Sequence, residues 1–156
     1  MQKVYTLLPA LALAFVAACA QPSSQLLTTQ SDLDAHRQQW DALDLDGYRF
    51  TFERSCFCPP ELRPRVTITV ENGLVESVHD AQSGKLLTNP PYSYTINDLF
   101  AIIQEAVDEG AAMVSVTYDP RFGHPVDVYI DTYANAADEE FSMAVRDLAE
   151  LPIKSR

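Results

Sequence analysis

Two cysteines separated by a single residue, Cys56 and Cys58, are the residues of this chain whose type and spacing best suit chemistry. Three interpretations of the pair are open. One is a structural disulfide, because paired cysteines in exported proteins are usually oxidised. The others are a thiol-redox role and the binding of a soft metal such as copper(I) or zinc. In an extended strand the two Cα atoms would lie about 6.6 Å apart, so a disulfide requires a local bend.

His79 joins this candidate site through a predicted hairpin. Asn-Gly at 72–73, between two alternating segments, is typical of a two-residue type I′ turn. That turn would place Val66 opposite His79, and so Cys58 and His79 at one end of a sheet. A Cys56/Cys58/His79 metal cluster would be feasible there. The simpler alternative is a half-buried histidine that bonds to nearby backbone.

Three arginines, Arg54, Arg63 and Arg65, fall in the same region of the sequence. One interpretation is that they lower a thiol pKa or contact an anionic group of a partner. The alternative is that they pair with neighbouring acids. Arg54 also shares the parity of the apolar residues before it, which predicts either a bulge nearby or an arginine directed at the end of the sheet.

An antiparallel sheet is expected to position these residues. Alternation of apolar and polar residues predicts strands over 48–58, 65–71, 74–80, 113–118 and 126–130. The segment that starts at Phe141 is either a last strand or a helix. Helical spacing predicts one helix over 32–43, capped by Ser31. A second is predicted between a Thr95 cap and Gly110.

The pattern helix-strand-strand-strand therefore occurs twice, at about 31–80 and 95–148. We predict an α+β fold in which about six antiparallel strands form one sheet with both helices on one face. The two halves would be a tandem pair in layout. The other face of the sheet would be solvated or used for binding.

The N-terminus predicts export. Residues 1–18 are typical of a secretory signal, with Lys3 ahead of an apolar run. The run ends in VAAC at 16–19, which resembles the lipobox of bacterial lipoproteins. That resemblance implies cleavage before Cys19, lipidation of its thiol and acylation of its amine. Ala20 replaces the aspartate that retains such proteins in the inner membrane, which favours the periplasmic side of the outer membrane.

Residues 19–30 would then be a lipidated cysteine and a flexible tether, followed by a single domain at 31–152. The formal net charge of −11 argues against nucleic acid as a partner and against adsorption to anionic lipid. The membrane contact would be the lipid alone. The sequence contains no GxSxG elbow, HExxH motif, phosphate loop or dinucleotide fingerprint, so we expect neither an enzyme nor a cofactor.

Four segments carry a family resemblance: YRFTFERSCFCPPE at 48–61, VTITVENG at 66–73, LFAII at 99–103 and VTYDPRFGHPVDVYID at 116–131. They resemble a family of secreted bacterial lipoproteins catalogued as a domain of unknown function of the 6174 type. The resemblance spans about residues 40–147. It supports the domain boundary and the export, and it brings no catalytic residues.

These observations predict a lipid-anchored binding module of the cell envelope. It would meet a protein partner through the open sheet face or through the loop at 119–125. The first alternative is a thiol-redox or soft-metal protein that uses Cys56 and Cys58. The second is an inhibitor of an envelope enzyme, by analogy with other folds in which helices pack on an antiparallel sheet.

Overall fold

The structure is a computed structural model, and it describes residues 28–136 and 139–152. Within this part of the chain there are two α-helices, α1 (Gln30–Asp41) and α2 (Ile96–Asp108), and a short 3-10 helix, η1 (Pro60–Leu62). The strands are β1 (Gly47–Cys56), β2 (Val66–Glu71), β3 (Leu74–Asp80), β4 (Met113–Tyr118), β5 (Pro125–Asp131) and β6 (Phe141–Glu150).

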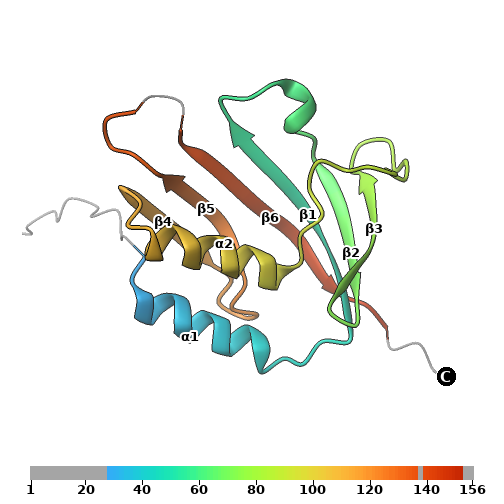
Figure 1. The fold of residues 1–156 in the computed structure, drawn as a ribbon. Coiled ribbons are helices and arrows are strands. Elements are labelled where there is room, and N and C mark those ends of the chain that lie inside the picture. Colours follow the sequence, from blue (N-terminus) through green and yellow to red (C-terminus); the bar gives the residue numbers. More distant parts are fainter. Residues whose placement is uncertain (1–27, 137–138, 153–156) are drawn as a thin grey trace, which may run out of the picture.

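The six strands form one sheet in the order β3-β2-β1-β6-β5-β4, and every neighbouring pair is antiparallel. Both helices lie on the same face of this sheet (Figure 1). The predicted α+β architecture is confirmed, and the segment from Phe141 is a strand. No element of the described residues covers the opposite face, which we call the outer face.

Each half of the chain contributes three adjacent strands, and β1 joins the halves by pairing with β6. The layout is not a simple repeat, however. The first strand after α1 is central in the sheet, whereas β4, the first strand after α2, lies at an edge. The expected tandem order of elements is therefore present along the chain, but corresponding strands of the two halves do not occupy equivalent positions in the sheet.

The core lies between the helices and the inner face of the sheet. Alternate residues of β1, Tyr48, Phe50 and Phe52, are buried, as their spacing predicts. The only tryptophan, Trp40, packs edge-on against Tyr48 and donates a 2.8 Å hydrogen bond to Asn97 Oδ1. Each large apolar side chain buried in this way contributes about 1.5–3 kcal/mol to stability. From α2 the buried residues are Ile96, Leu99, Phe100, Ile103 and Ala106.

Both α-helices begin with a capping box. Thr95 caps α2 and its partner at the third helical position is Asp98, as predicted. Helix α1 differs from the prediction: its cap is Thr29, not Ser31, and it covers 30–41 in place of 32–43. Thr29 has extended backbone, and its side chain accepts from the amide of Asp32, whose carboxylate accepts from Thr29. Residues 28–30, assigned to the tether on the basis of the sequence, are thus part of the fold, because Thr28 also bonds to β4.

Strand β1 ends at Cys56, two residues before its predicted end. The irregularity of its pairing lies between Arg49 and Thr51, opposite β6. Of the two alternatives predicted for Arg54, a nearby bulge or a side chain directed at the end of the sheet, the bulge is therefore not at that residue. No bulge is needed there because the Arg54 side chain is accommodated on the inner face, where its guanidinium packs on the rings of Tyr92 and Phe141.

The β2–β3 hairpin has the predicted turn, in which Asn72 and Gly73 adopt positive φ values of 51° and 74°. Val70 lies opposite Val75, as that turn requires, but an irregularity between Thr69 and Val70 shifts the rest of the register. His79 consequently lies opposite Thr67 and not opposite Val66. Because a slip of one residue moves a side chain to the other face of a sheet, His79 stands on the outer face.

Candidate functional site

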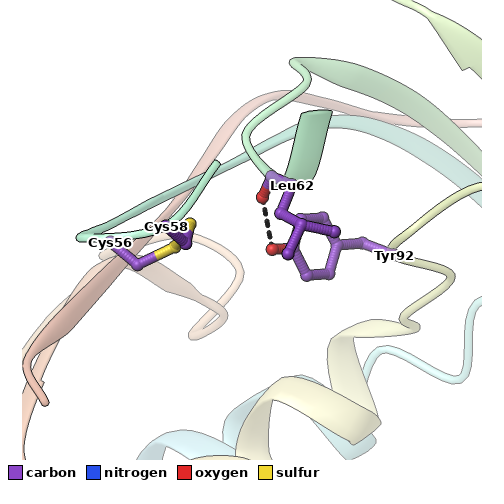
Figure 2. Close-up of a disulfide and its surroundings, with 4 residues drawn as sticks. All are labelled: Cys56, Cys58, Leu62 and Tyr92. Atoms are coloured by element: carbon purple, nitrogen blue, oxygen red, sulfur yellow. Dashed lines mark hydrogen bonds between the residues drawn. A yellow bond between two sulfur atoms is a disulfide. The ribbon is translucent and has the colours of Figure 1, made fainter. Parts of the chain in front are cut away.

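Cys56 and Cys58 form a disulfide at the end of β1 (Figure 2). Their Cα atoms are 5.2 Å apart, closer than in an extended strand, so the local bend that the spacing requires is present. Both residues are half-buried. Beyond them, Pro59 precedes η1, which begins at Pro60. The hydroxyl of Tyr92 donates to the carbonyl oxygen of Leu62, which ties this connection to the core (Figure 2).

The predicted Cys56/Cys58/His79 cluster is not assembled. Strand β1 is longer than β2, since the last pair between them is Phe52 with Val66. His79 lies in one row with Thr67 and Thr51. Cys56 is five residues further along β1, a distance of about 17 Å. Among residues 28–136 and 139–152, no three side chains of His, Cys, Asp or Glu converge to hold a metal ion.

The three arginines do not form one cluster either. Arg54 lies 4.3 Å from the ring centroid of Phe141 and 5.5 Å from that of Tyr92, and its Nε is buried without a hydrogen-bond partner in the described part of the chain. It packs as a cation on aromatic faces, on the inner side of the sheet. Arg63 and Arg65 are exposed in the connection from β1 to β2. Only these two remain available to a partner.

The outer face of the sheet carries an ordered array of polar side chains, several of them serine or threonine, over β1, β6, β5 and β4. In one row, Ser55 lies opposite Ser142, Ser142 opposite Tyr129, and Tyr129 opposite Ser115. These residues line a shallow depression of about 340 Å³. The neighbouring row of the same depression consists of Glu53, Ala144, Asp127 and Thr117.

Arg146 closes one side of this array. Its guanidinium pairs with the carboxylate of Asp127 and donates 2.8 Å and 2.9 Å hydrogen bonds to the carbonyl oxygens of Val126 and Val145. The positive charge of Arg146 therefore balances the negative charge of Asp127. Glu53 is exposed at the other side of the depression. The array can accept and donate hydrogen bonds, and its small side chains let another chain approach closely.

A larger groove, of about 650 Å³, follows the seam between α1 and α2. Its floor is occupied by contacts internal to the fold: Arg37 donates a 3.1 Å hydrogen bond to the carbonyl oxygen of Phe100 and lies 5.6 Å from the centroid of its ring. Two further polar residues of its lining, Asn97 and Gln104, bond across the helices to Trp40 and Gln30. We therefore assign the groove to the architecture and not to a binding site.

The loop at 119–125, predicted to be a partner surface, folds back on α1. Gln39 Nε2 donates to the carbonyl oxygens of Pro120 and Arg121, and Gly123 lies against the first helix. Gly123, His124 and Pro125 are buried, so only the tip at 120–121 is exposed. This loop is mainly a structural contact.

His124 is a polar residue that sequence reasoning did not single out. It is 4% exposed, and its Nδ1 has no hydrogen-bond partner among the described residues. Burial lowers the pKa of His124 because it disfavours the charged imidazolium, and nearby Asp119 partly opposes this effect. Its burial depends on packing against Trp40, whose ring centroid lies 6.0 Å away. No local sequence signal indicates such a contact.

A stacked pair lies beside it: the rings of His36 and Tyr118 are 4.0 Å apart between centroids. Burial raises the pKa of the Tyr118 hydroxyl to about 12, so this group stays neutral at physiological pH.

The predicted lipidation residue, Cys19, lies outside the described residues, as does the signal at 1–18. Neither helix of the described part has the length and hydropathy of a membrane-spanning segment.

A comparison with families of known proteins finds a match over most of the described chain. The model of a family of unknown function, DUF6174, matches residues 32–150, from α1 to the last residue of β6. No curated protein matches the chain, and no solved structure matches it.

Proposed function

The chain belongs to the DUF6174 family, and for this member we propose the role of a lipid-anchored interaction module of the cell envelope. Its anchor would be the acylated Cys19, on the periplasmic side of the outer membrane. Its binding surface would be the outer face of the sheet, and its partner a protein. Inhibition of an envelope enzyme would be one consequence of such docking.

The outer face is the observation that carries this proposal. A six-stranded sheet covered by helices on one side only leaves its other side without an internal partner in the described chain. Over β1, β4, β5 and β6 that side presents hydroxyl groups around a 340 Å³ depression. Hydroxyl groups satisfy a range of donors and acceptors, which suits a protein surface better than an apolar ligand.

Export is supported by the disulfide. Disulfides persist in oxidising compartments such as the periplasm and are rare in the cytosol. The Cys56–Cys58 bond therefore agrees with the signal predicted at 1–18 and with a mature chain that begins at Cys19.

The anchor is tested by expressing the full chain in a diderm bacterium and measuring the intact mass of the membrane-extracted protein. We expect the mass of residues 19–156 plus acyl chains. Cys19→Ser is the matched control and should accumulate unacylated. A wild-type protein that is exported without acyl chains would exclude the lipid anchor.

The binding surface is tested by placing a photo-crosslinking amino acid at Ser142, in the centre of the outer face, or at Gln38, exposed on α1. We expect one defined adduct from position 142 and none from 38. The adduct should be competed by added wild-type protein and not by the Ser142→Arg variant. Equal adducts from both positions, or competition by the variant, would exclude this face.

A second candidate function is thiol exchange, and the disulfide itself favours it. The bond joins cysteines two positions apart in a connection at the molecular surface. Equilibration with glutathione separates the two roles. A potential near about −200 mV, as in exchange proteins, would support thiol exchange, whereas a value below about −300 mV would mark a structural bond.

A further inference from the structure

Three large exposed apolar side chains lie in two connections at one end of the sheet. Phe57, between the two cysteines, is 80% exposed, Tyr133 is 62% exposed and Leu62 is 45% exposed. Phe57 and Leu62 belong to the connection from β1 to β2, and Tyr133 follows β5. Single exposed apolar residues are ordinary, but three at one end of a small domain indicate a contact surface. We call these three residues the apolar tip.

The strand register places the two parts of the apolar tip at the same end. Cys56 lies opposite Phe141 of β6, and Phe141 lies opposite Ile130 of β5. Strand β1 ends at Cys56 and β5 ends one residue after Ile130. The connection after β1 and the connection after β5 therefore leave the sheet at the same end of the strands (Figure 1).

The N-terminal segment enters the fold at this end as well. The amide of Thr28 donates a 3.0 Å hydrogen bond to the carbonyl oxygen of Val114, and Val114 lies opposite Ile130. Val114 and Cys56 thus stand in one row, three strands apart, which corresponds to about 14 Å. The first described residue and the disulfide share one end of the molecule.

Chain length then limits the distance of the apolar tip from the membrane. Cys19 and Thr28 are nine residues apart, a span of at most about 32 Å when fully extended. The opposite end of β1, a ten-residue strand, lies about 31 Å further along the sheet. If Cys19 carries lipid, as the proposed function holds, the tether holds the end of the domain that bears the apolar tip within reach of the bilayer, whereas the opposite end can lie much further away.

We propose that the apolar tip, led by Phe57, inserts into the interface of an uncharged, zwitterionic bilayer and orients the lipid-anchored domain. This inference rests on the proposed function. The three-residue Cys56–Phe57–Cys58 loop holds the ring outside the sheet, where it has no contact with the core. The amphipathic ring of Tyr133 favours the headgroup region of membranes, and the apolar side chains of Phe57 and Leu62 gain free energy when they are buried just below it. Anionic lipid is a poor partner because the whole chain has a formal charge of −11.

Fluorescence quenching tests this contact in the full lipidated chain. Phe57→Trp is reconstituted into phosphatidylcholine vesicles whose lipids carry bromine near the headgroups. Leu74→Trp is the matched control, because Leu74 is 73% exposed at the opposite end, next to the Asn72-Gly73 turn. The native Trp40 is buried in the core and supplies the background. We expect brominated lipid to remove most of the added emission of Phe57→Trp and to leave that of Leu74→Trp unchanged.

The mass of the same samples separates two kinds of failure. A mass without acyl chains overturns the lipid anchor itself. A fully acylated protein in which the two variants are quenched equally, or in which Phe57→Trp is not quenched, overturns only the insertion of the apolar tip. A blue shift of Phe57→Trp emission in native envelopes without quenching by brominated lipid would assign the tip to a protein partner.

Discussion

The amide of Thr28 donates its hydrogen to the carbonyl oxygen of Val114, and Thr28 Oγ1 accepts a 2.9 Å hydrogen bond from the amide of Val116. One residue thereby pairs with two backbone groups on the exposed edge of β4. An uncovered strand edge is a template for unwanted pairing, so this contact protects the edge where the chain enters the fold.

Removing the side chain of Thr28 should weaken that contact. Thr28→Ala leaves the Val116 amide without its acceptor, and we expect a loss of about 1 kcal/mol in the free energy of unfolding. Hydrogen exchange at the Val116 amide should accelerate as well. Thr88→Ala, in the exposed connection before α2, is the control and should change neither quantity. Unchanged exchange at Val116 would contradict the contact.

Gly123 is required by two independent constraints. Its φ is +80°, and a Cβ there would lie 2.9 Å from the carbonyl oxygen of His36 and from the Cβ of Gln39. Gly123→Ala should therefore cost about 1–2 kcal/mol for the left-handed backbone and a further 1–3 kcal/mol for overpacking against α1. Chemical denaturation measures the sum.

Gly84→Ala separates the two costs. Gly84 has φ +69°, but a Cβ there would meet nothing within 4 Å. We expect only the backbone cost, about 1–2 kcal/mol, from this variant. If both variants lost the same free energy of unfolding, that result would contradict the close packing of the 119–125 loop on α1.

Burial of His124 predicts a loss of stability in mild acid. Its pKa in the folded state is below the ordinary value of 6.5, so below pH 6.5 the unfolded chain binds a proton that the folded chain does not. Stability should therefore fall as the pH falls from 7.5 to 5.5. The lowered pKa values of Asp32, Asp80 and Asp119 act later, below about pH 4.

Urea unfolding of wild type and His124→Gln at pH 7.5 and 5.5 measures this linkage. The variant should lose less stability between the two values than wild type does. Between pH 7.5 and 8.5 the imidazole is neutral in both states, so the two proteins should keep a constant difference. An equal acid loss in both proteins would assign the effect to other groups.

The Cys56–Cys58 bond predicts a defined pattern of thiol alkylation. In the exported Cys19→Ser variant these are the two remaining cysteines. We expect no alkylation before reduction and two adducts after it, both read from the intact mass. Two adducts without reduction would show that both thiols are free, which would contradict the disulfide and favour the metal-binding interpretation of Cys56 and Cys58.

Local features of this fold could be read from the sequence because neighbouring residues determine them. The turn at Asn72-Gly73, the Thr95–Asp98 capping box and the buried face of β1 all depend on contacts within a few positions. Backbone sterics and the period of two residues suffice to predict them. The disulfide was one of three open interpretations, and its residues were identified by type and spacing alone.

The tertiary structure decided the features that depend on distant contacts. Pairing of β1 with β6 joins residues about ninety positions apart, and no local signal specifies that neighbour. The irregularity at Thr69–Val70 placed His79 on the outer face, and the extension of β1 beyond its pairing with β2 separated Cys56 from His79. Burial of His124 required α1 to pack beside its loop. Register and burial depend on which surfaces meet, so they emerge only when the whole chain is folded.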